Sequence, residues 1–277
     1  MAPPSPPRVA PWSHRAMGNT TAVRYGALAL AVGLGGIVGA CSNDKGSGAT
    51  RSLPAACRAE VQLEDAVAAV PTPDDASKAT PAEIAAFKAG YPPVTRAVAA
   101  LEAALPTQPK VVTDLLDQLT AIGRTGDPSK LDSIDGDAMG AWFFERCDDQ
   151  NTALTAKEYR YDGALGAVSP GAFRVKLHNG GAQLHEMVLL RRNDGETQSF
   201  TELLALGDAA KSKAKLINAT VAGQGKDSYL SATLTPGSYA MVCFIPDGTT
   251  SFDQLQSGTA QGAPHFTKGM IRELTVK

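Results

Sequence analysis

Hydrophobic residues change their spacing part-way along this chain, and the change divides it into two parts. Between about residues 55 and 150, they recur three or four positions apart, as in helices that bury one face. From about residue 155 onward, they alternate with polar residues in short runs, as in strands with one buried face. The pattern predicts an α+β protein in two domains, with a small helical bundle over 55–150 and an antiparallel β-sandwich over 155–277.

The first part contains recognisable helix boundaries. Thr80-Pro81-Ala82-Glu83 forms a capping box with proline in the first helical position. Tyr91-Pro92-Pro93 must break or kink a helix, because proline lacks the N–H donor and clashes with the preceding turn. A last helix over 135–147 is expected to carry Trp142 and Phe143 inward. Two apolar stripes at helical spacing lie between these points: Val98, Leu101, Ala104 and Leu105, and then Val111, Leu115, Leu119 and Ile122.

The second part consists of short runs with strand character, separated by turns. Apolar and polar residues alternate from Phe173 to His178, which predicts a strand with one buried face and places Arg174 opposite to Phe173. Asn179-Gly180-Gly181 and Asn193-Asp194-Gly195 are turn sequences. Short strands separated by turns favour an antiparallel sandwich. Further strands are expected at 159–161, 184–192, 229–234, 238–245 and 270–277, with a short helical insertion over 201–206 and 209–215.

The N-terminal segment has the pattern of a secretory signal peptide. Arg15 and Arg24 precede an apolar run over 25–40, and small residues precede Cys41. The run is shorter than the roughly 20 residues that span a bilayer. Its ending resembles a bacterial lipobox, which implies that Cys41 becomes the lipidated first residue of the mature protein. We therefore expect an exported lipoprotein, anchored through its lipid to the outer face of the bacterial cytoplasmic membrane; an uncleaved membrane anchor is the alternative.

The segments around this run complete the expected N-terminal organisation. Residues 1–41 are assigned to the lipoprotein signal peptide. Because residues 1–16 are rich in proline and unlike the start of a signal peptide, Met17 is an alternative start. Residues 42–54 are small and polar, so we expect them to form a flexible tether between the membrane and the first folded domain.

Charge and motifs exclude several classes of function. The 26 Lys and Arg residues nearly balance the 28 Asp and Glu residues, so the chain lacks the basic character of a nucleic-acid-binding protein. It contains no Gly-x-Ser-x-Gly elbow, no Walker loop and no His-Glu-x-x-His, so we expect no enzyme. A thiol catalyst built from Cys243 and His265 is an alternative, although no residue is identified that would orient the pair. Asp132, Asp135 and Asp137 are interpreted as a solvated loop, because the closing Glu of an EF-hand is missing.

The four cysteines can be assigned to different roles. Cys41 carries lipid in this interpretation. Cys57 and Cys147 could pair in the oxidising exterior, where disulfides persist, and would then hold the ends of the helical bundle together. This segment loosely resembles helical domains of actinobacterial lipoproteins, which open with one cysteine and close on a Trp…Cys segment. Cys243 is left as a lone thiol, for which metal ligation is one explanation and an inert buried thiol is another.

A candidate metal site lies in the C-terminal part. Two apolar, β-prone runs flank a long loop there. Cys243 lies near the end of the first run, and His265 and Met270 lie at the start of the second. His185 lies upstream, beside another strand-like run. Two imidazole nitrogens, a thiolate and a thioether form the ligand set that suits a blue-copper electron-transfer centre.

Three segments give residues 159–277 a resemblance to the cupredoxin family. The first, from Asn179 to Glu186, is similar to the Asn-x-Gly…His segment that presents the family's first histidine. The second, from Pro236 to Cys243, has tyrosine four residues before cysteine, as in plastocyanin-like domains. The third, from His265 to Val276, is similar to the His-x-x-x-Gly-Met…Val ending. The Cys-Phe-Ile-Pro sequence at the end of the second segment is most similar to sulfocyanin-type domains.

The resemblance implies a Greek-key sandwich that binds one type 1 copper ion. His185, Cys243 and His265 match the two imidazole ligands and the thiolate, and Met270 matches the weak axial thioether. His178 is an alternative imidazole, and Met270 is alternatively a core residue. Such a site suits both Cu(I) and Cu(II), so electron transfer requires little rearrangement. Three residues are candidates for the apolar shell that tunes the potential: Met187, Phe244 and Phe266.

The loop between cysteine and histidine departs from the cupredoxin pattern. The family usually has a handful of residues there, whereas 21 residues separate Cys243 from His265. The insertion, 247–263, is polar and Gly-rich, so we expect an excursion that returns His265 to the site. The leading hypothesis is a membrane-anchored copper-binding protein that holds copper or transfers single electrons with a redox partner protein. The alternative is a metal-free lipoprotein of the same fold that binds a partner through the 247–263 loop.

Overall fold

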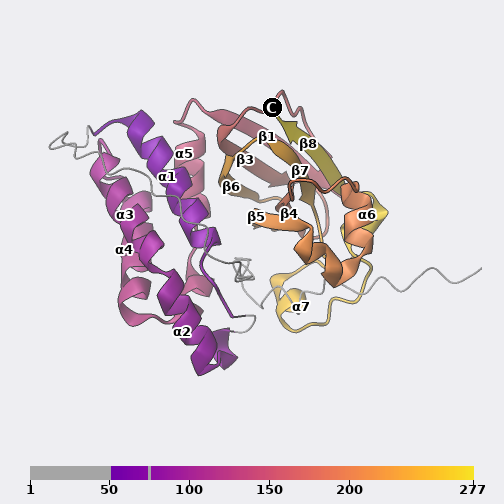
Figure 1. The fold of residues 1–277 in the computed structure, drawn as a ribbon, viewed down its shortest axis with the longest axis horizontal. Coiled ribbons are helices and arrows are strands. Elements are labelled where there is room, and N and C mark those ends of the chain that lie inside the picture. Colours follow the sequence, from indigo (N-terminus) through magenta and orange to yellow (C-terminus); the bar gives the residue numbers. More distant parts are fainter. Residues whose placement is uncertain (1–50, 74–75) are drawn as a thin grey trace, which may run out of the picture.

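The computed structural model describes residues 51–73 and 76–277 (Figure 1). The predicted signal peptide, the lipidation site Cys41 and most of the predicted tether lie outside these residues. The last two residues of the predicted tether belong to the first helix, α1, which begins at Leu53. This start is favoured because the Ser52 hydroxyl accepts a hydrogen bond from the backbone N–H of Ala55. No helix in the described ranges is long and apolar enough to cross a membrane.

Within the described residues, helices α1 to α5 build the first part of the chain. Thr80 caps α2 as predicted, because its hydroxyl accepts from the N–H of Glu83 (3.3 Å) while the Glu83 carboxylate accepts from the N–H of Thr80 (2.8 Å). The prolines also break the helix as predicted, since α2 ends at Gly90 and α3 begins at Pro92. The bounds are α1 Leu53–Ala68, α2 Pro81–Gly90, α3 Pro92–Ala104, α4 Lys110–Thr125 and α5 Asp137–Phe144, with short 3₁₀ helices η1 Ala76–Lys78 and η2 Pro128–Ser133.

The apolar stripes of these helices share one core. The predicted stripe that begins at Val98 is buried throughout. On α4 the buried stripe begins at Val112, whereas Val111 is 42% exposed, so the prediction was wrong by one position there. Phe143 is fully buried and Trp142 packs against the same core, partly buried, so the last helix does carry its aromatic residues inward.

The second part is a sandwich of two four-stranded sheets, in the orders β2-β1-β3-β6 and β5-β4-β7-β8. All neighbouring strands in these sheets are antiparallel except β1 and β3, which run parallel. The predicted fold class is confirmed: a helical bundle is followed by a sandwich of two sheets, antiparallel apart from this one pair. The bounds are β1 Gln150–Lys157, β2 Arg160–Asp162, β3 Gly171–Asn179, β4 His185–Arg192, β5 Ala214–Ala222, β6 Asp227–Leu234, β7 Gly237–Val242 and β8 Ile271–Val276.

Two strands differ from the sequence-based expectation. β1 begins inside the range assigned to the helical bundle, and β5 begins inside the range assigned to a helical insertion. The insertion itself forms α6 (Phe200–Ala205) and the 3₁₀ helix η3 (Gly207–Ser212), which pack on the outer face of β4 and β7. β4 is therefore buried on both faces over most of its length, which explains its nearly continuous apolar run.

The helical bundle covers the outer edge of the other sheet. Helices α1 and α5 lie against β6, the last strand of that sheet (Figure 1). The Asp65 carboxylate on α1 accepts from the backbone N–H of Thr233, and the Asp137 carboxylate on α5 accepts from the backbone N–H of Tyr229, both at 3.1 Å. An uncovered edge strand presents unpaired N–H groups to other chains. The two carboxylates bind two of these groups and fix the bundle to the sandwich.

Arg174 joins the two parts from within. The alternation of β3 predicted it on a face away from the core, but it is 1% exposed because α1 covers that face. Its Nη2 donates to Glu60 Oε2 (2.7 Å) and to the backbone carbonyl of Cys57 (2.6 Å), and its Nη1 donates to Asp149. Cys57 is bonded to Cys147, which confirms the predicted disulfide across 90 positions of sequence. The disulfide and Arg174 therefore hold the start and end of the bundle against β3.

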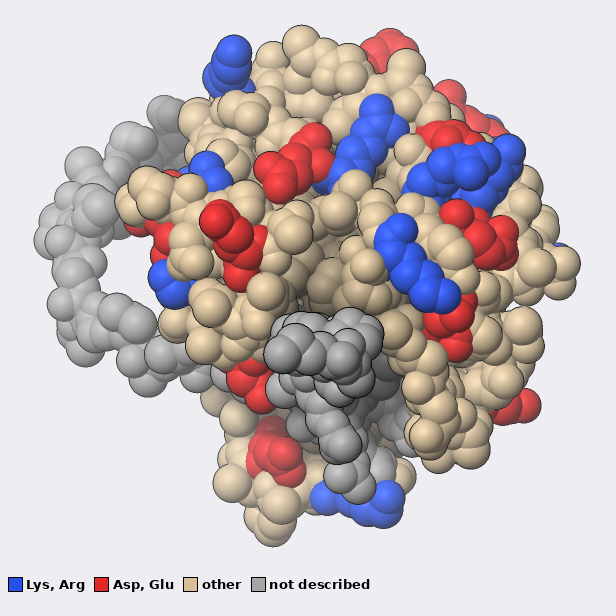
Figure 2. Space-filling model, turned by 90° about the vertical axis from the view of Figure 1, so that its right-hand side faces the viewer, with Lys and Arg blue, Asp and Glu red and all other residues tan. Residues whose placement is uncertain are grey.

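Charged residues of both signs are mixed on the face drawn in Figure 2. The surface contains ion pairs such as Arg191–Asp194 (2.8 Å) and Lys213–Glu196 (2.6 Å). The face in Figure 2 shows no extended patch of one sign.

Candidate metal centre

The residues predicted as ligands come together at one end of the sandwich. His185 begins β4, Cys243 follows the last residue of β7, and His265 begins the 3₁₀ helix η4 (His265–Lys268). One ligand atom from each lies within 4.8 Å of the other two, and all three side chains are fully buried. Met270, just before β8, is also fully buried and belongs to the same core cluster as Cys243.

Sheet order explains why these distant segments meet. β4, β7 and β8 are neighbours in one sheet, with Val188 opposite Val242 and Val242 opposite Ile271. The beginning of β4, the end of β7 and the beginning of β8 therefore lie at the same end of this sheet. The backbone pairing of these three strands therefore brings the residues at these strand ends close together.

The long loop between Cys243 and His265 is closed at its base. Pro246 and Pro264 form an isolated β-bridge, and the N–H of Asp247 donates to the carbonyl of Ala263 at 2.9 Å. Directly inside this bridge, the N–H of His265 donates to the carbonyl of Ile245, also at 2.9 Å. The loop is therefore an excursion from a closed ladder, and its length does not change where His265 lies.

The body of the loop is also attached to the sandwich. It contains a short helix that the sequence did not predict, α7 (Phe252–Gln256), capped by the Ser251 hydroxyl. Phe252 and Leu255 pack against the sandwich core. Thr249 is 1% exposed, and its carbonyl accepts from the N–H of Leu184 at 2.8 Å, next to the His185 strand. These contacts give the loop a defined path over the site.

The Cys243 sulfur is fully buried, and several polar groups lie close to it. The N–H of Glu186 lies 3.5 Å from Sγ, and Nδ1 of His265 lies 3.4 Å from it. The Glu186 carboxylate accepts from the N–H of Phe244 at 2.6 Å, so Glu186 holds the Cys243 segment through both its backbone and its side chain. Burial raises the pKa of the Cys243 thiol well above its usual value, and the nearby Glu186 charge adds to this shift. Without a cation the sulfur is a thiol.

The side chain of His185 is buried, but its two ring nitrogens lack hydrogen bonds to the described residues. Neither ring nitrogen has a hydrogen-bond partner in the described part of the chain, and the nearest carboxylate oxygen, Oε1 of Glu158, is 3.7 Å from Nε2. Burial lowers the pKa of His185, although the Glu158 charge partly opposes this shift. A Cβ atom at Gly181 would lie 2.6 Å from His185 Nε2 and 2.5 Å from Glu158 Oε1, so a larger residue would require at least one of these two side chains to move.

His265 is enclosed by the second imidazole and by an aromatic ring. Its ring centroid lies 5.0 Å from that of His185 and 5.4 Å from that of Tyr159. Burial, and then the neighbouring His185, lower the pKa of His265 to about 4. Both imidazoles are therefore neutral near pH 7, which is the form that binds metals.

The apolar surroundings of sulfur differ in part from the expectation. Met187 shares a core cluster with Cys243. Phe244 and Phe266 pack on each other at 5.2 Å and belong to the separate cluster beneath α6, so they lie on the other face of the sheet. His178, the alternative imidazole, is half-exposed on β3 and pairs with Asp227 at 2.7 Å, away from the site. Cys243 and the buried histidines thus form the cluster without His178.

The donor set and its burial fit a soft transition metal. A thiol and two neutral imidazoles converge, with a buried thioether nearby, and this combination suits copper better than it suits Mg²⁺ or Ca²⁺. Buried polar atoms normally have hydrogen-bond partners. One of the two orphaned nitrogens of His185 would gain a partner if a cation lay between the three side chains.

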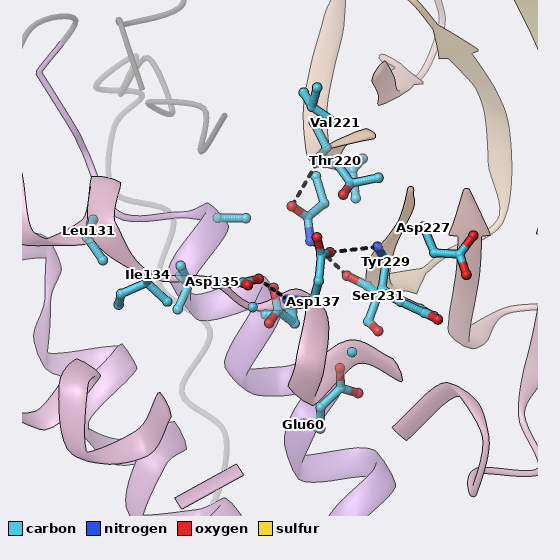
Figure 3. A pocket seen from close by; sticks show the side chains of 18 of the residues that line it. Glu60, Leu131, Ile134, Asp135, Asp137, Thr220, Val221, Asp227, Tyr229 and Ser231 are labelled. Carbon is cyan, nitrogen blue, oxygen red and sulfur yellow. Dashed lines mark hydrogen bonds between the residues drawn. The ribbon is translucent and has the colours of Figure 1, made fainter. Parts of the chain in front are cut away.

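A cavity of about 570 Å³ lies elsewhere, between α1, the segment 131–137 and strands β5 and β6 (Figure 3). Carboxylates line it, but several have partners within the protein. Asp137 accepts from the backbone of Tyr229, Glu60 accepts from Arg174, and Asp227 pairs with Lys176. None of the predicted ligands is among the described residues that line this cavity. It is a feature of the junction between the two parts and is separate from the His-Cys-His cluster.

Four residues around the cluster were not identified from the sequence. Gln183 contacts His265, Glu158 lies beside His185, and Asp247 and Tyr159 contact each other and the base of the long loop. Gln183 lies within the segment that carries the resemblance to cupredoxins, but that pattern assigns it no role. The other three lie outside the three matched segments, so spacing gave no signal for them.

Comparison with solved structures finds auracyanins that cover the C-terminal half of this chain. No family model matches the chain, and a search of curated proteins finds no match. Dithionite-reduced auracyanin from Roseiflexus castenholzii is 19% identical with a TM-score of 0.32, covering 47% of this chain and 98% of that chain. Auracyanin B is 19% identical with a TM-score of 0.30, covering 46% and 88%. Auracyanin A from Chloroflexus aurantiacus, described as a "blue" copper protein, is 18% identical with a TM-score of 0.30, covering 46% and 98%.

Proposed function

We propose that this chain is a copper-binding electron-transfer or copper-holding protein with one type 1 site. The observation that carries the proposal is the convergence of His185, Cys243 and His265 within 4.8 Å, all fully buried, with both nitrogens of His185 unpartnered in the described structure. A buried group without a partner costs free energy, so selection for folding alone would remove it. Met270 is proposed as the weak axial ligand.

The residues around the site fit this role. Copper bound there would accept and release one electron. The strand ends of one sheet hold the ligands, and full burial excludes water from them. Rigid ligands suit electron transfer because little has to move when the metal charge changes. With four protein ligands no coordination position is left for a substrate, so we propose no enzymatic turnover.

The test of the copper site is a titration of the chain from Ser42 onward with Cu(II), followed by visible absorption and metal analysis. We expect one copper per chain and an intense thiolate-to-copper charge-transfer band that is absent in Cys243→Ala. His178→Ala is the matched control, because this half-exposed histidine lies outside the cluster, and it should keep the band. Failure of the wild-type chain to bind stoichiometric metal would refute the proposal.

We also propose that the protein is exported and anchored to the outer face of the bacterial cytoplasmic membrane through a lipid on Cys41, where it would meet a redox partner protein. The support is the sequence pattern before Cys41. In a bacterial host, the wild-type chain is expected in the membrane fraction and Cys41→Ala in the soluble or uncleaved form. A wild-type chain that takes up no more labelled fatty acid in that host than Cys41→Ala does would refute lipid anchoring and leave the copper proposal unaffected.

A further inference from the structure

Gln183 connects the long loop to the candidate ligand His265. Its amide oxygen lies 3.1 Å from Nε2 of His265 and also accepts from the backbone N–H of Gly248. Its amide nitrogen donates to Oδ1 of Asp247 at 3.1 Å. One side chain therefore contacts the candidate ligand on one side and two residues at the base of the loop on the other.

These contacts fix the orientation of the amide. A backbone N–H can only donate, so the atom facing Gly248 must be the amide oxygen. A carboxylate can only accept when ionised, so the atom facing Asp247 must be the amide nitrogen. Both assignments agree, and they leave an oxygen facing His265. Because an amide oxygen has no proton to donate, Nε2 of His265 must be the donor.

The position of that proton determines what the rest of the ring can do. A neutral imidazole with a proton on Nε2 has a lone pair on Nδ1. Nδ1 of His265 is the atom that lies 3.4 Å from Cys243 Sγ, inside the cluster. The hydrogen bond to Gln183 therefore presents an unprotonated nitrogen toward the sulfur.

We propose that Gln183 is a positioning residue, which fixes His265 as the Nε2–H tautomer and aims its Nδ1 lone pair at the site shared with Cys243 and His185. Metal ligands of this type generally donate their second ring N–H to an acceptor that sets tautomer and ring orientation. The consequence for copper rests on the proposed function, whereas the tautomer itself is a property of the metal-free protein.

Asp247 in turn holds Gln183 in place. Its carboxylate accepts from Tyr159 Oη and from Lys268 Nζ, both at 2.5 Å, in addition to the Gln183 amide. The Lys268 hydrogen bond is the main cause that keeps the pKa of Asp247 well below its usual value. Tyr159 is the only described non-glycine residue with a positive φ, 67°, a conformation that persists where surrounding contacts require it.

This network gives the long loop a part in the site. Asp247 and Gly248 are the first residues of the insertion, and both bind the Gln183 side chain rather than His265 itself. The insertion therefore acts on His265 through Gln183. This arrangement explains how a loop of 21 residues is compatible with an accurately placed ligand.

The first test uses the purified full chain without metal, labelled with ¹⁵N in its four histidines. Long-range ¹H–¹⁵N correlation spectra show which ring nitrogen carries the proton, and a His265→Gln variant identifies the His265 signals. We expect wild-type His265 to carry its proton on Nε2. A wild-type ring with its proton on Nδ1 would overturn the proposal without any substitution at Gln183.

Substitutions at Gln183 then test the cause. Gln183→Ala removes the acceptor and should shift His265 toward a mixture of tautomers, and Gln183→Leu, which keeps most of the side-chain volume, should do the same. Gln224→Ala, in the exposed turn between β5 and β6, is the matched control and should behave as wild type. An unchanged tautomer in a folded Gln183→Ala protein would overturn the proposal.

Copper binding provides a second, separable measurement. We expect Gln183→Ala and Gln183→Leu each to lower copper affinity by about 10- to 100-fold and to shift the charge-transfer band. Wild-type affinity and an unshifted band in Gln183→Ala would overturn the part of the proposal that concerns metal. If the wild-type chain binds no copper but the tautomer results are as expected, the proposed function fails and the positioning role of Gln183 in the metal-free protein stands.

Discussion

Two buried polar clusters in this chain have opposite hydrogen-bonding states. At the junction, Arg174 is 1% exposed and donates to Glu60, to Asp149 and to a backbone carbonyl. In the sandwich, His185 is just as buried, yet neither of its ring nitrogens has a hydrogen-bond partner among the described residues. Burial alone therefore does not distinguish the two clusters.

The difference lies in what each cluster needs in order to be stable. Polar groups lose their hydration on burial, and the loss is offset only when protein partners replace water. The junction cluster has these partners in the chain itself, so folding alone accounts for it. Within the described residues, the His-Cys-His cluster lacks them for one imidazole, which supports the proposed metal site. Substitutions in the first should alter stability without affecting copper, and substitutions in the second should do the reverse.

The largest effect, on the free energy of unfolding, is expected from Arg174→Met. This change leaves Glu60 buried without its ion partner, and breaking one side of a buried pair typically costs about 3–5 kcal/mol of the free energy of unfolding. We expect the lower end, about 3 kcal/mol, because Glu60 can take up a proton. Chemical denaturation measures the loss, and the copper charge-transfer band of the folded fraction should be unchanged.

A double variant shows whether the unpaired charge or the lost packing causes the loss of stability in Arg174→Met. Arg174→Met combined with Glu60→Leu removes both buried ions, and an apolar replacement of a buried pair is often neutral or stabilising. We expect it to recover most of the lost stability. If Arg174→Met abolished copper binding while leaving stability unchanged, the division between a structural and a functional cluster would be wrong.

A smaller effect should appear as a dependence of stability on pH. Burial raises the pKa of Glu60 from 4.5 to about 7, with Arg174 opposing the shift. Between these values the folded chain holds more protons than the unfolded chain, so this group lowers the free energy of unfolding as pH rises, by about 3 kcal/mol at most. Glu60→Gln lacks the dependence, so its stability relative to wild type should increase between pH 5 and pH 7.

The comparison uses the difference between two chains because it cancels every contribution to the pH dependence that the two chains share. Denaturant midpoints and slopes would be measured for both at several pH values. A difference that stays constant from pH 5 to pH 8 would mean that Glu60 titrates normally and that Arg174 compensates fully for its burial. The copper band should not follow this titration in either chain.

The sequence predicted the His-Cys-His cluster but not the buried cluster around Arg174, for a physical reason. The candidate ligands were identified because the metal chemistry restricts residue types, and because three segments with fixed spacing resemble one family. Arg174 was assigned to the face of β3 away from the core. Alternation along a strand shows only that two faces differ, and it carries no information about a distant helix that covers the second face. Its burial depends on α1, more than 100 residues earlier.

Local and non-local elements were likewise predicted to different extents. The capping box at Thr80 and the proline break at Pro92 depend on a few adjacent residues, and both are confirmed. β5 was missed because its apolar residues do not alternate cleanly in an edge strand with a bulge, and its pairing with β4 is set by the sheet. Gln183 could not be identified, since its role depends on Asp247 and Gly248, which reach it only through the path of the long loop.

The smallest effect, on copper affinity, is expected from Gly181→Ala, because space around His185 is limited. A methyl group at Gly181 would lie 2.6 Å from Nε2 of His185 and 2.5 Å from the Glu158 carboxylate, so at least one of them must move. We expect Gly181→Ala to weaken copper binding by about 10- to 100-fold, as displacement of groups that orient a metal ligand typically does.

Gly180→Ala is the matched control, because its nearest contact is a Thr155 methyl group at 3.0 Å. Competition with a copper chelator measures both affinities, while denaturation should show similar stabilities for the two variants. Equal copper affinities would mean that His185 does not need its present position, and the orphaned nitrogens would then have to be explained without a metal.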